Sequence, residues 1–427
     1  MAIAEFHDVV QKVDVMPDSA PRKKVMLISP NFGGGGAERS IAKLSISLSE
    51  KNYDVHFVIF NVFPGREQVY PIKGLLHVLD IPAGKSYFGK AIRFIQRVRK
   101  VKRLKRELKI DVCISFLEGA DYVNILSKKE EKVVISIRGS KENDDEIKGP
   151  LGWLRKRILM PWLYKKTDTI VCVSEGIRLE IEGALSLGLG KATVIYNYYD
   201  VDAIKSLGNE PLPPYAERLF EQPCVISIGR LHPQKNHAGL IRSFAHAKKL
   251  GSDYKLVILG NGELKGQLIN LCESLKLSVS SLVDETLNPA ADIVFLGYQK
   301  NPWLFMSKAS IFVLSSSWEG FPNALAEAMC LGLPVISTAC PHGPCEMLSD
   351  EPLRLQKNDV AQITKYGALI PVLNEEKDYI ACGEIIELFL KDNQLSLAVG
   401  NAGQNRIRTF SAESVLEGWL DVIEGRK

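Results

Sequence analysis

The chain has 427 residues, a length that suits two compact domains of about 200 residues each better than one hydrophobic core. Its composition, 46% hydrophobic and 24% charged residues, is that of a soluble globular protein and excludes a disordered chain. The net charge of +4 is divided unevenly. Residues 1–210 hold 34 Lys and Arg against 26 Asp and Glu, and residues 211–427 hold 20 against 24. We therefore expect a basic surface on the amino-terminal half alone.

The cysteines and the amino terminus indicate the compartment. Eight cysteines are scattered, mostly inside apolar runs, and Cys340 with Cys345 is the closest pair in sequence. This usage favours a reduced, cytoplasmic compartment. The amino terminus carries Glu5 and Asp8 and lacks the apolar core of a secretory signal. No run approaches the roughly 18 apolar residues of a membrane span, so a membrane contact would be peripheral.

Residues 1–23 are expected to form a peripheral extension, followed by a buried strand at Val25–Ser29. Four glycines, Gly33–Gly36, then precede a helix, and glycines there let backbone N–H groups approach a ligand closely. A dinucleotide-binding loop is disfavoured, because Glu38 breaks the glycine register and the second strand ends at Asn61 instead of an acidic residue. A flexible turn remains the alternative.

Helical segments alternate with further apolar runs, which predicts a doubly wound parallel sheet in the first half. These strands are expected at Leu75–Ile81, Asp111–Phe116, Val133–Ile137 and Thr169–Val173. The first domain is expected to end near Asp200-Val-Asp202, beside a Pro-rich linker at residues 210–214. An Asp-x-Asp after a strand can also hold a metal ion, but the neighbouring linker favours an interdomain turn.

Two segments of the first half are basic and apolar. Lys90–Lys109 contains ten basic residues and one acidic residue, with apolar positions at helical spacing. We expect its apolar stripe to face the sheet and its basic face to meet an anionic membrane, where each charge contributes about 1 kcal/mol. Trp153–Lys166 combines two Trp with basic residues, which suits the headgroup zone. The alternative for Lys90–Lys109 is a solvated basic face, and the alternative for Trp153–Lys166 is a helix that packs in the core. For Lys90–Lys109, nucleic acid is the disfavoured rival partner, because no aromatic stacking platform or helix-turn-helix signature accompanies this helix.

The second half repeats the strand-to-helix pattern with polar residues at the junctions. Arg230 and Lys235 follow the strand Cys224–Ile228, and such a pair can meet the two charges of a diphosphate. The strands Lys255–Gly260 and Ile293–Leu296 run into turns that contain Asn261, Gly262, Tyr298 and Gln299. Residues 278–291 read as a polar loop, and residues 351–365 as an insertion.

The stretch Ser315–Thr338 reads as a loop, a helix at Ala324–Leu331 and a strand, following the apolar run Ile311–Leu314. Such a unit is normally parallel and right-handed, with its loop at the carboxyl edge of the sheet. It carries Glu319 in the loop and Glu327 on the helix, so both carboxylates are expected to face one crevice. The free N–H groups of the first helical turn predict an anion site.

The sequence EGFPNALAE, from Glu319 to Glu327, resembles the paired-glutamate signature of glycosyltransferase family 4. The Gly-Gly-Ala-Glu-Arg loop at residues 35–39 and the Gly229-Arg230 to Lys235 element resemble two more of its motifs, and the resemblance covers roughly residues 24–425. It implies an α/β GT-B fold with two Rossmann-like doubly wound parallel-sheet domains facing a cleft. An acceptor-binding domain at residues 24–205, with the helix 411–427, and a nucleotide-sugar-binding domain at residues 206–410 are expected.

The resemblance also implies roles for individual residues. Glu319, Arg230 and Lys235 would be catalytic, with Glu319 near the reacting carbon, and Glu327 would hold the ribose hydroxyls. The expected nucleotide-sugar contacts are Gly34, Gly35, Gly36, Gly229, Asn261, Gly262, Tyr298, Gln299, Phe321, Pro322, Asn323, Ala324 and Glu327. Arg138, Glu118 and Arg39 are expected on the acceptor side, and Arg138 stands where several family members have His. No metal and no cofactor besides the donor substrate are expected.

The implied activity is retaining transfer of a hexose or N-acetylhexosamine from a nucleoside diphosphate sugar, with UDP as the expected nucleotide. The acceptor would be a saccharide or a lipid-linked glycan at the cytoplasmic membrane face, with an anionic membrane as a partner and no nucleic acid. A nucleotide-sugar epimerase of GT-B fold is an alternative, although the additional acid and base groups that it needs are not evident. A non-catalytic nucleotide-sugar-binding protein is the other alternative.

Overall fold

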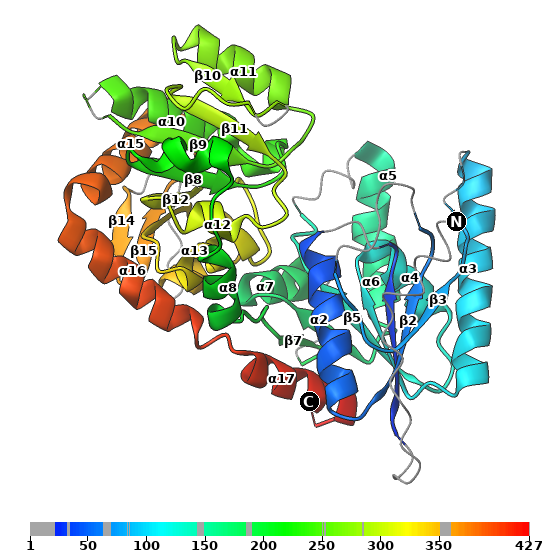
Figure 1. Cartoon of the computed structure of the whole chain (residues 1–427). Helices are drawn as coiled ribbons and strands as arrows, with labels where there is room; N and C mark the ends of the chain where they lie inside the picture. Colours follow the sequence, from blue (N-terminus) through cyan, green and yellow to red (C-terminus); the bar gives the residue numbers. More distant parts are fainter. Residues whose placement is uncertain are drawn as a thin grey trace. The chain divides into compact units, whose positions relative to one another are not determined.

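The computed structural model describes residues 22–426 except 32–34, 63–69, 83, 85, 143–148, 185–189, 250, 252, 284–285 and 351–359. The chain forms two compact units (Figure 1). Unit 1 comprises Met1–Asn197 and Val415–Lys427, and unit 2 comprises Tyr198–Ser414. Most of the expected extension at residues 1–23, and the predicted contact Gly34, lie outside the described residues.

The boundary between the units falls earlier than the expected position after residue 205. The helix α8 (Val201–Gly208) belongs to unit 2. The Ser307 hydroxyl donates a 2.6 Å hydrogen bond to the carbonyl of Gly208, and the side-chain amide of Asn301 donates to the carbonyl of Leu207. Asp200 lies directly before α8, three residues after Asn197 of unit 1. Its side chain accepts a hydrogen bond from the Ala203 amide and caps this helix.

Unit 1 contains a seven-stranded sheet in the order β3-β2-β1-β4-β5-β6-β7, in which every neighbouring pair is parallel. The strands are β1 (Lys24–Ser29), β2 (Asp54–Ile59), β3 (Leu75–Val78), β4 (Val112–Phe116), β5 (Lys132–Ile137), β6 (Thr169–Cys172) and β7 (Ala192–Val194). The central strands β1 and β4 are almost wholly buried, as expected for a sheet covered on both faces.

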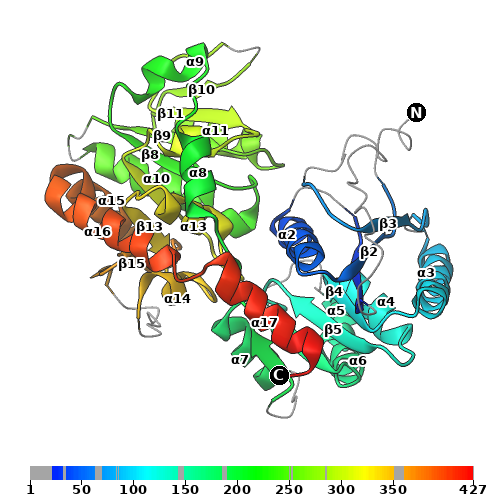
Figure 2. The same cartoon turned by 60° about the horizontal axis from the view of Figure 1, so that its bottom comes forward.

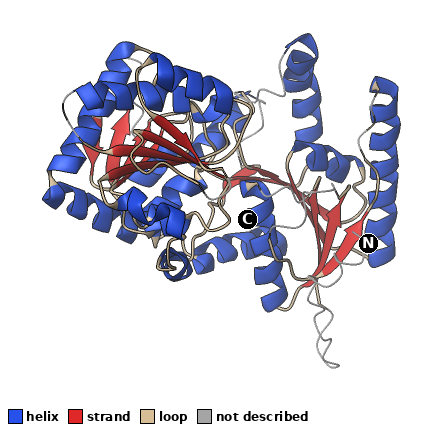
Figure 3. Ribbon diagram, turned by 45° about the horizontal axis from the view of Figure 1, so that its top comes forward, coloured by secondary structure: helices blue, strands red, loops and turns tan. Residues whose placement is uncertain are grey.

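The helices of unit 1 pack around this sheet (Figure 3). They are α2 (Gly36–Glu50), α3 (Tyr87–Leu108), α4 (Glu118–Leu126), α5 (Gly149–Leu154), the π-helical turn η2 (Arg155–Leu159), α6 (Met160–Tyr164) and α7 (Glu175–Ala184). The carboxyl-terminal helix α17 (Ala412–Glu424) also packs here (Figure 2), with the Trp419 ring stacked 5.9 Å from that of Phe116.

Unit 2 contains an eight-stranded sheet in the order β10-β11-β9-β8-β12-β13-β15-β14, parallel except for the edge pair β14–β15. Its strands are β8 (Cys224–Ile228), β9 (Lys255–Leu259), β10 (Val279–Ser281), β11 (Ile293–Gly297), β12 (Ile311–Leu314), β13 (Val335–Thr338), β14 (Gln362–Thr364) and β15 (Gly367–Ile370). The prediction of two Rossmann-like parallel-sheet domains is confirmed.

The remaining helices belong to unit 2. They are α9 (Pro214–Glu217), η3 (Arg218–Phe220), η4 (Pro233–Lys235), α10 (His237–Lys249), α11 (Lys265–Ser274), α12 (Trp303–Met306), α13 (Asn323–Cys330), α14 (Pro344–Leu348), α15 (Glu376–Lys391) and α16 (Asn393–Ile407). The core between sheet and helices is built from fully buried aliphatic and aromatic side chains such as Val225, Phe244 and Ile336.

Two predicted irregular segments contain strands. The loop expected at residues 278–291 includes β10, which pairs in parallel with β11, and the insertion expected at residues 351–365 includes β14, which pairs antiparallel with β15. Both are three-residue edge strands, too short to show an alternating pattern in the sequence. Residues 351–359 of that insertion lie outside the described residues.

The basic helix α3 differs from the predicted picture of one apolar and one charged face. Val101 is fully buried, but Ile92 and Ile95 of the predicted stripe are 40% and 48% exposed. The Arg97 guanidinium donates to the carbonyl of Ile81, and the Lys100 ammonium donates to that of Leu79. Arg97 and Lys100 therefore bind carbonyl groups of the segment that follows β3. Their charges are not fully available to a membrane.

Candidate active site

The candidate site lies at the carboxyl edge of the unit 2 sheet. Strand β8 pairs with β9 on one side and with β12 on the other, so the winding direction of the sheet reverses between β8 and β12. In open parallel sheets, ligands bind outside the carboxyl ends of the strands at such a switch point. The turns after β8, β9, β11 and β12 hold most of the nucleotide-sugar contacts predicted from the sequence.

An ion pair joins the two turns that flank the switch point. The Nζ atom of Lys235, after β8, lies 2.5 Å from Oε1 of Glu319, after β12. The side chains are only 21% and 8% exposed, so the surrounding protein screens their attraction less than water would. The structure thus brings together two of the three residues predicted to be catalytic.

The third residue, Arg230, is exposed at the carboxyl end of β8. Among the described residues, no Asp or Glu forms an ion pair with its guanidinium, whereas the charge of Lys235 is balanced by Glu319. Arg230 therefore supplies a positive charge at this edge that no carboxylate of the described residues pairs with. The neighbouring His237 adds none, because burial lowers the pKa of its imidazole to about 3.

Local turns hold Lys235 in place. It ends the short helix η4, which begins after His232, whose Nδ1 atom accepts a hydrogen bond from the Gln234 amide. The Ser315 hydroxyl donates to the carbonyl of Lys235 at 2.8 Å. A Cβ atom at Gly229 would lie 3.0 Å from Cγ of Lys235, so the glycine leaves room for the lysine side chain to reach Glu319.

The turn after β9 packs directly on the turn after β8. The Leu231 amide donates to the carbonyl of Asn261, and a Cβ atom at Gly262 would lie 2.3 Å from the carbonyl oxygen of Leu231. Only glycine permits this close approach. Asn261 is exposed at the same edge as Arg230.

Strand β11 is the neighbour of β9 in the sheet, and the turn after β11 presents an aromatic ring. Tyr298 is 64% exposed, and the Gln299 side-chain amide donates to the carbonyl of Leu296 at 2.7 Å. The hydrogen bond fixes Gln299 against its own strand. The exposed Tyr298 ring provides a surface on which a planar ring could stack.

The glutamate loop leads into helix α13, whose first turn has no side-chain cap. Pro322 is its N-cap residue, and the Asn323 side chain accepts a hydrogen bond from the hydroxyl of Tyr199. Ala324 follows in the first turn, and Glu327 lies on this helix, 4% exposed. The backbone N–H groups of the first turn lack intrahelical acceptors and suit an anion. Phe321 anchors the loop by packing its ring on that of Phe410.

The cysteines near this loop have no covalent role in the fold. Cys340 and Cys345 are both free, so the pair noted in the sequence is not a disulfide. Burial, and secondarily the carboxylate of Glu319, raises the pKa of the Cys340 thiol. Its thiol therefore stays protonated at neutral pH, which disfavours a nucleophilic role.

The predicted acceptor residues lie in unit 1, at the carboxyl edge of its sheet. Arg39 lies in the first two turns of α2. The same helix carries Gly35 as its N-cap residue and Gly36 as its first residue, which were predicted as nucleotide-sugar contacts. The Arg138 guanidinium, after β5, donates to the Ser40 hydroxyl at 3.1 Å and to the side-chain oxygen of Asn197. Arg138 is thereby held by α2 and by the segment after β7.

Glu118, the remaining predicted acceptor residue, is held by cations. It opens α4 and is 8% exposed, and its carboxylate pairs with Arg155 at 2.5 Å and with Lys141 at 3.6 Å. The Tyr122 hydroxyl donates to it as well. Arg155 belongs to the π-helical turn, a conformation often found at functional sites.

Three residues that contact predicted site residues were not assigned roles from the sequence. They are Ser316, Asn197 and Arg155. Ser316 is one of three consecutive serines, and nothing in the sequence distinguishes the one whose hydroxyl reaches Glu319 at 2.6 Å. Asn197 and Arg155 are distant in sequence from their partners Arg138 and Glu118. The π-helical turn that carries Arg155 has no sequence signal of its own.

A fully buried carboxyl group, that of Asp121, makes unit 1 sensitive to pH. Burial raises its pKa from 3.8 to about 8, while its Oδ1 atom accepts a hydrogen bond from Ser115. The folded chain thus keeps a proton that the unfolded chain releases, so the free energy of unfolding should fall as pH rises from about 4 to about 8, by up to about 1.4 kcal/mol per pH unit.

The substitution Asp121→Asn should remove this pH dependence. Chemical denaturation of both proteins at about pH 5 and about pH 8 measures the effect. We expect the loss of stability between the two pH values to be smaller in the variant. Equal losses in the two proteins would contradict a protonated Asp121.

Comparisons with known proteins identify the family. The family described as Glycosyltransferase Family 4 matches residues 34–203, and the family described as Glycosyl transferases group 1 matches residues 217–406. An uncharacterized glycosyltransferase of Methanocaldococcus jannaschii is 31% identical over 361 residues, which cover 78% of this chain and 84% of that protein. The chain belongs to glycosyltransferase family 4. It is a glycosyltransferase, as the resemblance predicted.

Two further similar proteins extend the comparison. A Campylobacter jejuni enzyme is 27% identical over 94% of this chain and 100% of its own length. It is named N-acetylgalactosamine-N,N'-diacetylbacillosaminyl-diphospho-undecaprenol 4-alpha-N-acetylgalactosaminyltransferase. Among solved structures, HepE of Anabaena in complex with UDP matches with a TM-score of 0.66 and 16% identity, covering 94% of this chain and 100% of that one. The predicted GT-B fold is confirmed.

Proposed function

We propose that this glycosyltransferase moves a hexose or N-acetylhexosamine from a UDP-sugar to a saccharide or lipid-linked glycan, with retention at the anomeric carbon. The observation that carries the proposal is the Lys235–Glu319 ion pair at the strand switch point, beside the exposed Arg230. UDP is supported by the HepE complex, and a lipid-linked acceptor by the name of the Campylobacter jejuni enzyme. A cytoplasmic location at the membrane face is part of the proposal.

The proposed mechanism separates charge stabilisation from sugar binding. Arg230, Lys235 and the first turn of α13 stabilise the negative charge that develops on the leaving diphosphate, which is commonly the largest catalytic contribution. Glu319 binds the donor sugar near its reacting carbon, and Glu327 binds the ribose hydroxyls. The leaving phosphate accepts the proton of the acceptor hydroxyl, so the proposal needs neither a separate base nor a metal ion.

A panel of nucleotide sugars tests this function. The purified chain is incubated with UDP- and GDP-linked hexoses and N-acetylhexosamines, with and without an undecaprenyl diphosphate-linked saccharide, and nucleoside diphosphate release is measured. We expect release from a UDP-sugar that depends on the acceptor. Interconversion of free sugars would support an epimerase, and binding without turnover would support a nucleotide-sugar sensor.

We further propose that unit 1 rests on an anionic membrane through the segment Trp153–Trp162. Trp153, Ile158 and Trp162 are each more than half exposed, and the Lys166 ammonium lies 3.4 Å from the centre of the Trp162 ring. Exposed apolar rings with adjacent basic groups suit the boundary between headgroups and acyl chains. In the described part of the chain, no helix is long and apolar enough to cross a membrane.

The substitution of Trp153, Ile158 and Trp162 together by Ser should weaken vesicle binding. Fully burying one such side chain contributes about 1.5–3 kcal/mol, so losing three partly buried ones should lower the partition coefficient at least about tenfold. Co-sedimentation with phosphatidylglycerol-containing vesicles measures it. Leu397→Ser is the matched control, because Leu397 is 67% exposed but lies on α16 of unit 2. Equal binding by the triple variant and the control would contradict the proposal.

A further inference from the structure

Ser316 is a fully buried residue whose side chain touches the candidate site. Its hydroxyl donates a 2.6 Å hydrogen bond to Oε1 of Glu319, the same oxygen that receives the Lys235 ammonium at 2.5 Å. We infer that Ser316 is a positioning residue for sugar transfer, one that fixes the Glu319 carboxylate in the orientation that meets the donor sugar.

The backbone around Ser316 is anchored by hydrogen bonds. The carbonyl of Ser316 accepts a 2.5 Å hydrogen bond from the hydroxyl of Thr338, at the end of the neighbouring strand β13. The Ser317 amide donates to the carbonyl of Gln234, and the Gln234 side-chain amide donates to the carbonyl of Trp318. The segment that carries Ser316 is therefore tied both to β13 and to the turn that carries Lys235.

The two hydrogen bonds leave one carboxylate oxygen for substrate. Both end on Oε1 of Glu319, and no described residue donates to Oε2. A carboxylate held through one oxygen by two donors from anchored segments presents the other oxygen in a defined direction. Oε2 is thus the atom that accepts a hydroxyl hydrogen bond from the donor sugar.

Ser316 becomes more important once the donor is bound. Lys235 is assigned to the leaving diphosphate under the proposed function, so its ammonium must share its hydrogen bonds between Glu319 and the phosphate. The Ser316 hydroxyl is buried and, unlike Lys235, is not assigned to the diphosphate. It keeps Glu319 oriented while Lys235 responds to the developing charge, and a misplaced group of this kind can cost about 100-fold in rate.

This inference rests on the proposed function and is tested by steady-state kinetics of Ser316→Ala. We expect kcat to fall about 10- to 100-fold while the donor KM changes less than about threefold, because the variant still binds the nucleotide. Ser316→Thr, which keeps the hydroxyl, should recover most of the lost kcat. Ser337→Ala is the matched control, since Ser337 is also fully buried at this edge but its hydroxyl donates to the Thr338 carbonyl.

The outcomes separate the inference from the function on which it rests. Wild-type kcat in Ser316→Ala, or an equal fall in Ser316→Ala and Ser337→Ala, would overturn the positioning role while leaving the transferase intact. A fall in kcat that Ser316→Thr does not reduce would also overturn it, provided that the thermal unfolding midpoint of Ser316→Thr equals that of the wild type. A wild-type chain that releases no nucleoside diphosphate from any donor would overturn the proposed function and the inference together.

Discussion

Replacing either member of the site ion pair, by Lys235→Ala or Glu319→Ala, should lower kcat by about 100- to 1,000-fold. Removing a preorganised group that stabilises developing charge, as Lys235 is proposed to do, commonly costs this much. Loss of Glu319 misplaces the donor sugar, which can cost about 100-fold. The side chains are in contact at 2.5 Å, so the two substitutions should not be additive. Initial rates of UDP release for both single variants and the double variant measure the effect and the coupling.

Lys248→Ala is the matched control for this experiment. Lys248 also pairs with a carboxylate in unit 2, that of Asp292 at 3.0 Å, and its side chain is 26% exposed against 21% for Lys235. Asp292 precedes β11, so this pair lies at the amino edge of the sheet, away from the candidate site. We expect near wild-type kcat in Lys248→Ala. Wild-type kcat in Lys235→Ala or Glu319→Ala would contradict their catalytic roles.

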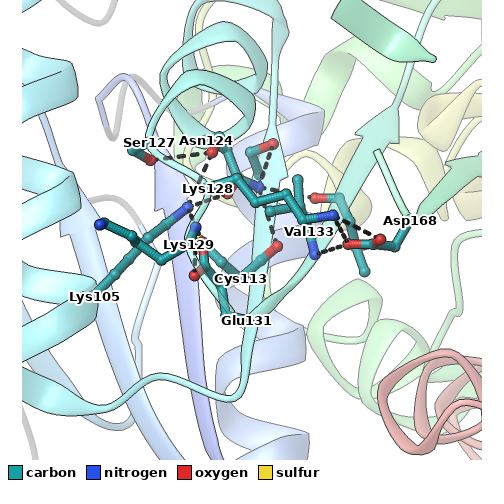
Figure 4. A network of polar contacts seen from close by, with 11 residues as sticks. Lys105, Cys113, Asn124, Ser127, Lys128, Lys129, Glu131, Val133 and Asp168 are labelled. Atoms are coloured by element: carbon teal, nitrogen blue, oxygen red, sulfur yellow. Dashed lines mark hydrogen bonds and ion pairs between the residues drawn. The ribbon is translucent and has the colours of Figure 1, made fainter. Parts of the chain in front are cut away.

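The substitution Lys105→Met should destabilise unit 1 by about 3–5 kcal/mol. Figure 4 shows the Lys105 ammonium between Glu131, 2.8 Å away, and Asn124, to whose backbone and side-chain oxygens it donates. The Lys105 and Glu131 side chains are 1% and 2% exposed. Removing one partner leaves an uncompensated buried charge, which is the costly way to break such a pair. Urea denaturation measures the change.

The same helix supplies a control for Lys105. Arg103 pairs with Glu107 at 2.7 Å, but its side chain is 72% exposed, and exposed pairs contribute about 1 kcal/mol or less. We expect Arg103→Met to change the free energy of unfolding little. The double variant Lys105→Met with Glu131→Gln should recover part of the loss, because it removes both charges. A similar small effect for Lys105→Met and Arg103→Met would contradict the buried ion pair.

Long apolar runs bounded by turn residues made most of the fold predictable. The strands Cys224–Ile228 and Ile311–Leu314 were predicted at their observed bounds, and the other predicted strands differ from the observed ones mainly at their ends. The short strands β7, β10, β14 and β15 were missed, because pairing with a neighbouring strand stabilises them and three or four residues leave little pattern in the sequence.

The residues of the candidate site were predictable where they belong to a sequence motif with fixed spacing. Contacts between residues that are distant in sequence were not predictable. Glu319 and Lys235 were singled out from the sequence, but their contact spans 84 positions and emerges only from the strand order. Lys105 looked like the other basic residues of α3, since its partners Asn124 and Glu131 lie beyond the helix. Tertiary contacts decide which members of a uniform run are buried.

The most direct test of the central claim is amide hydrogen exchange of the whole protein with and without UDP. The claim is that a nucleoside diphosphate binds at the carboxyl edge of the unit 2 sheet. We predict slower exchange on UDP addition in the segments 229–236, 260–263, 297–300 and 319–326, and unchanged exchange in β10 and β14 at the sheet edges. Protection confined to other segments, or no protection by UDP or GDP at saturating concentration, would contradict it.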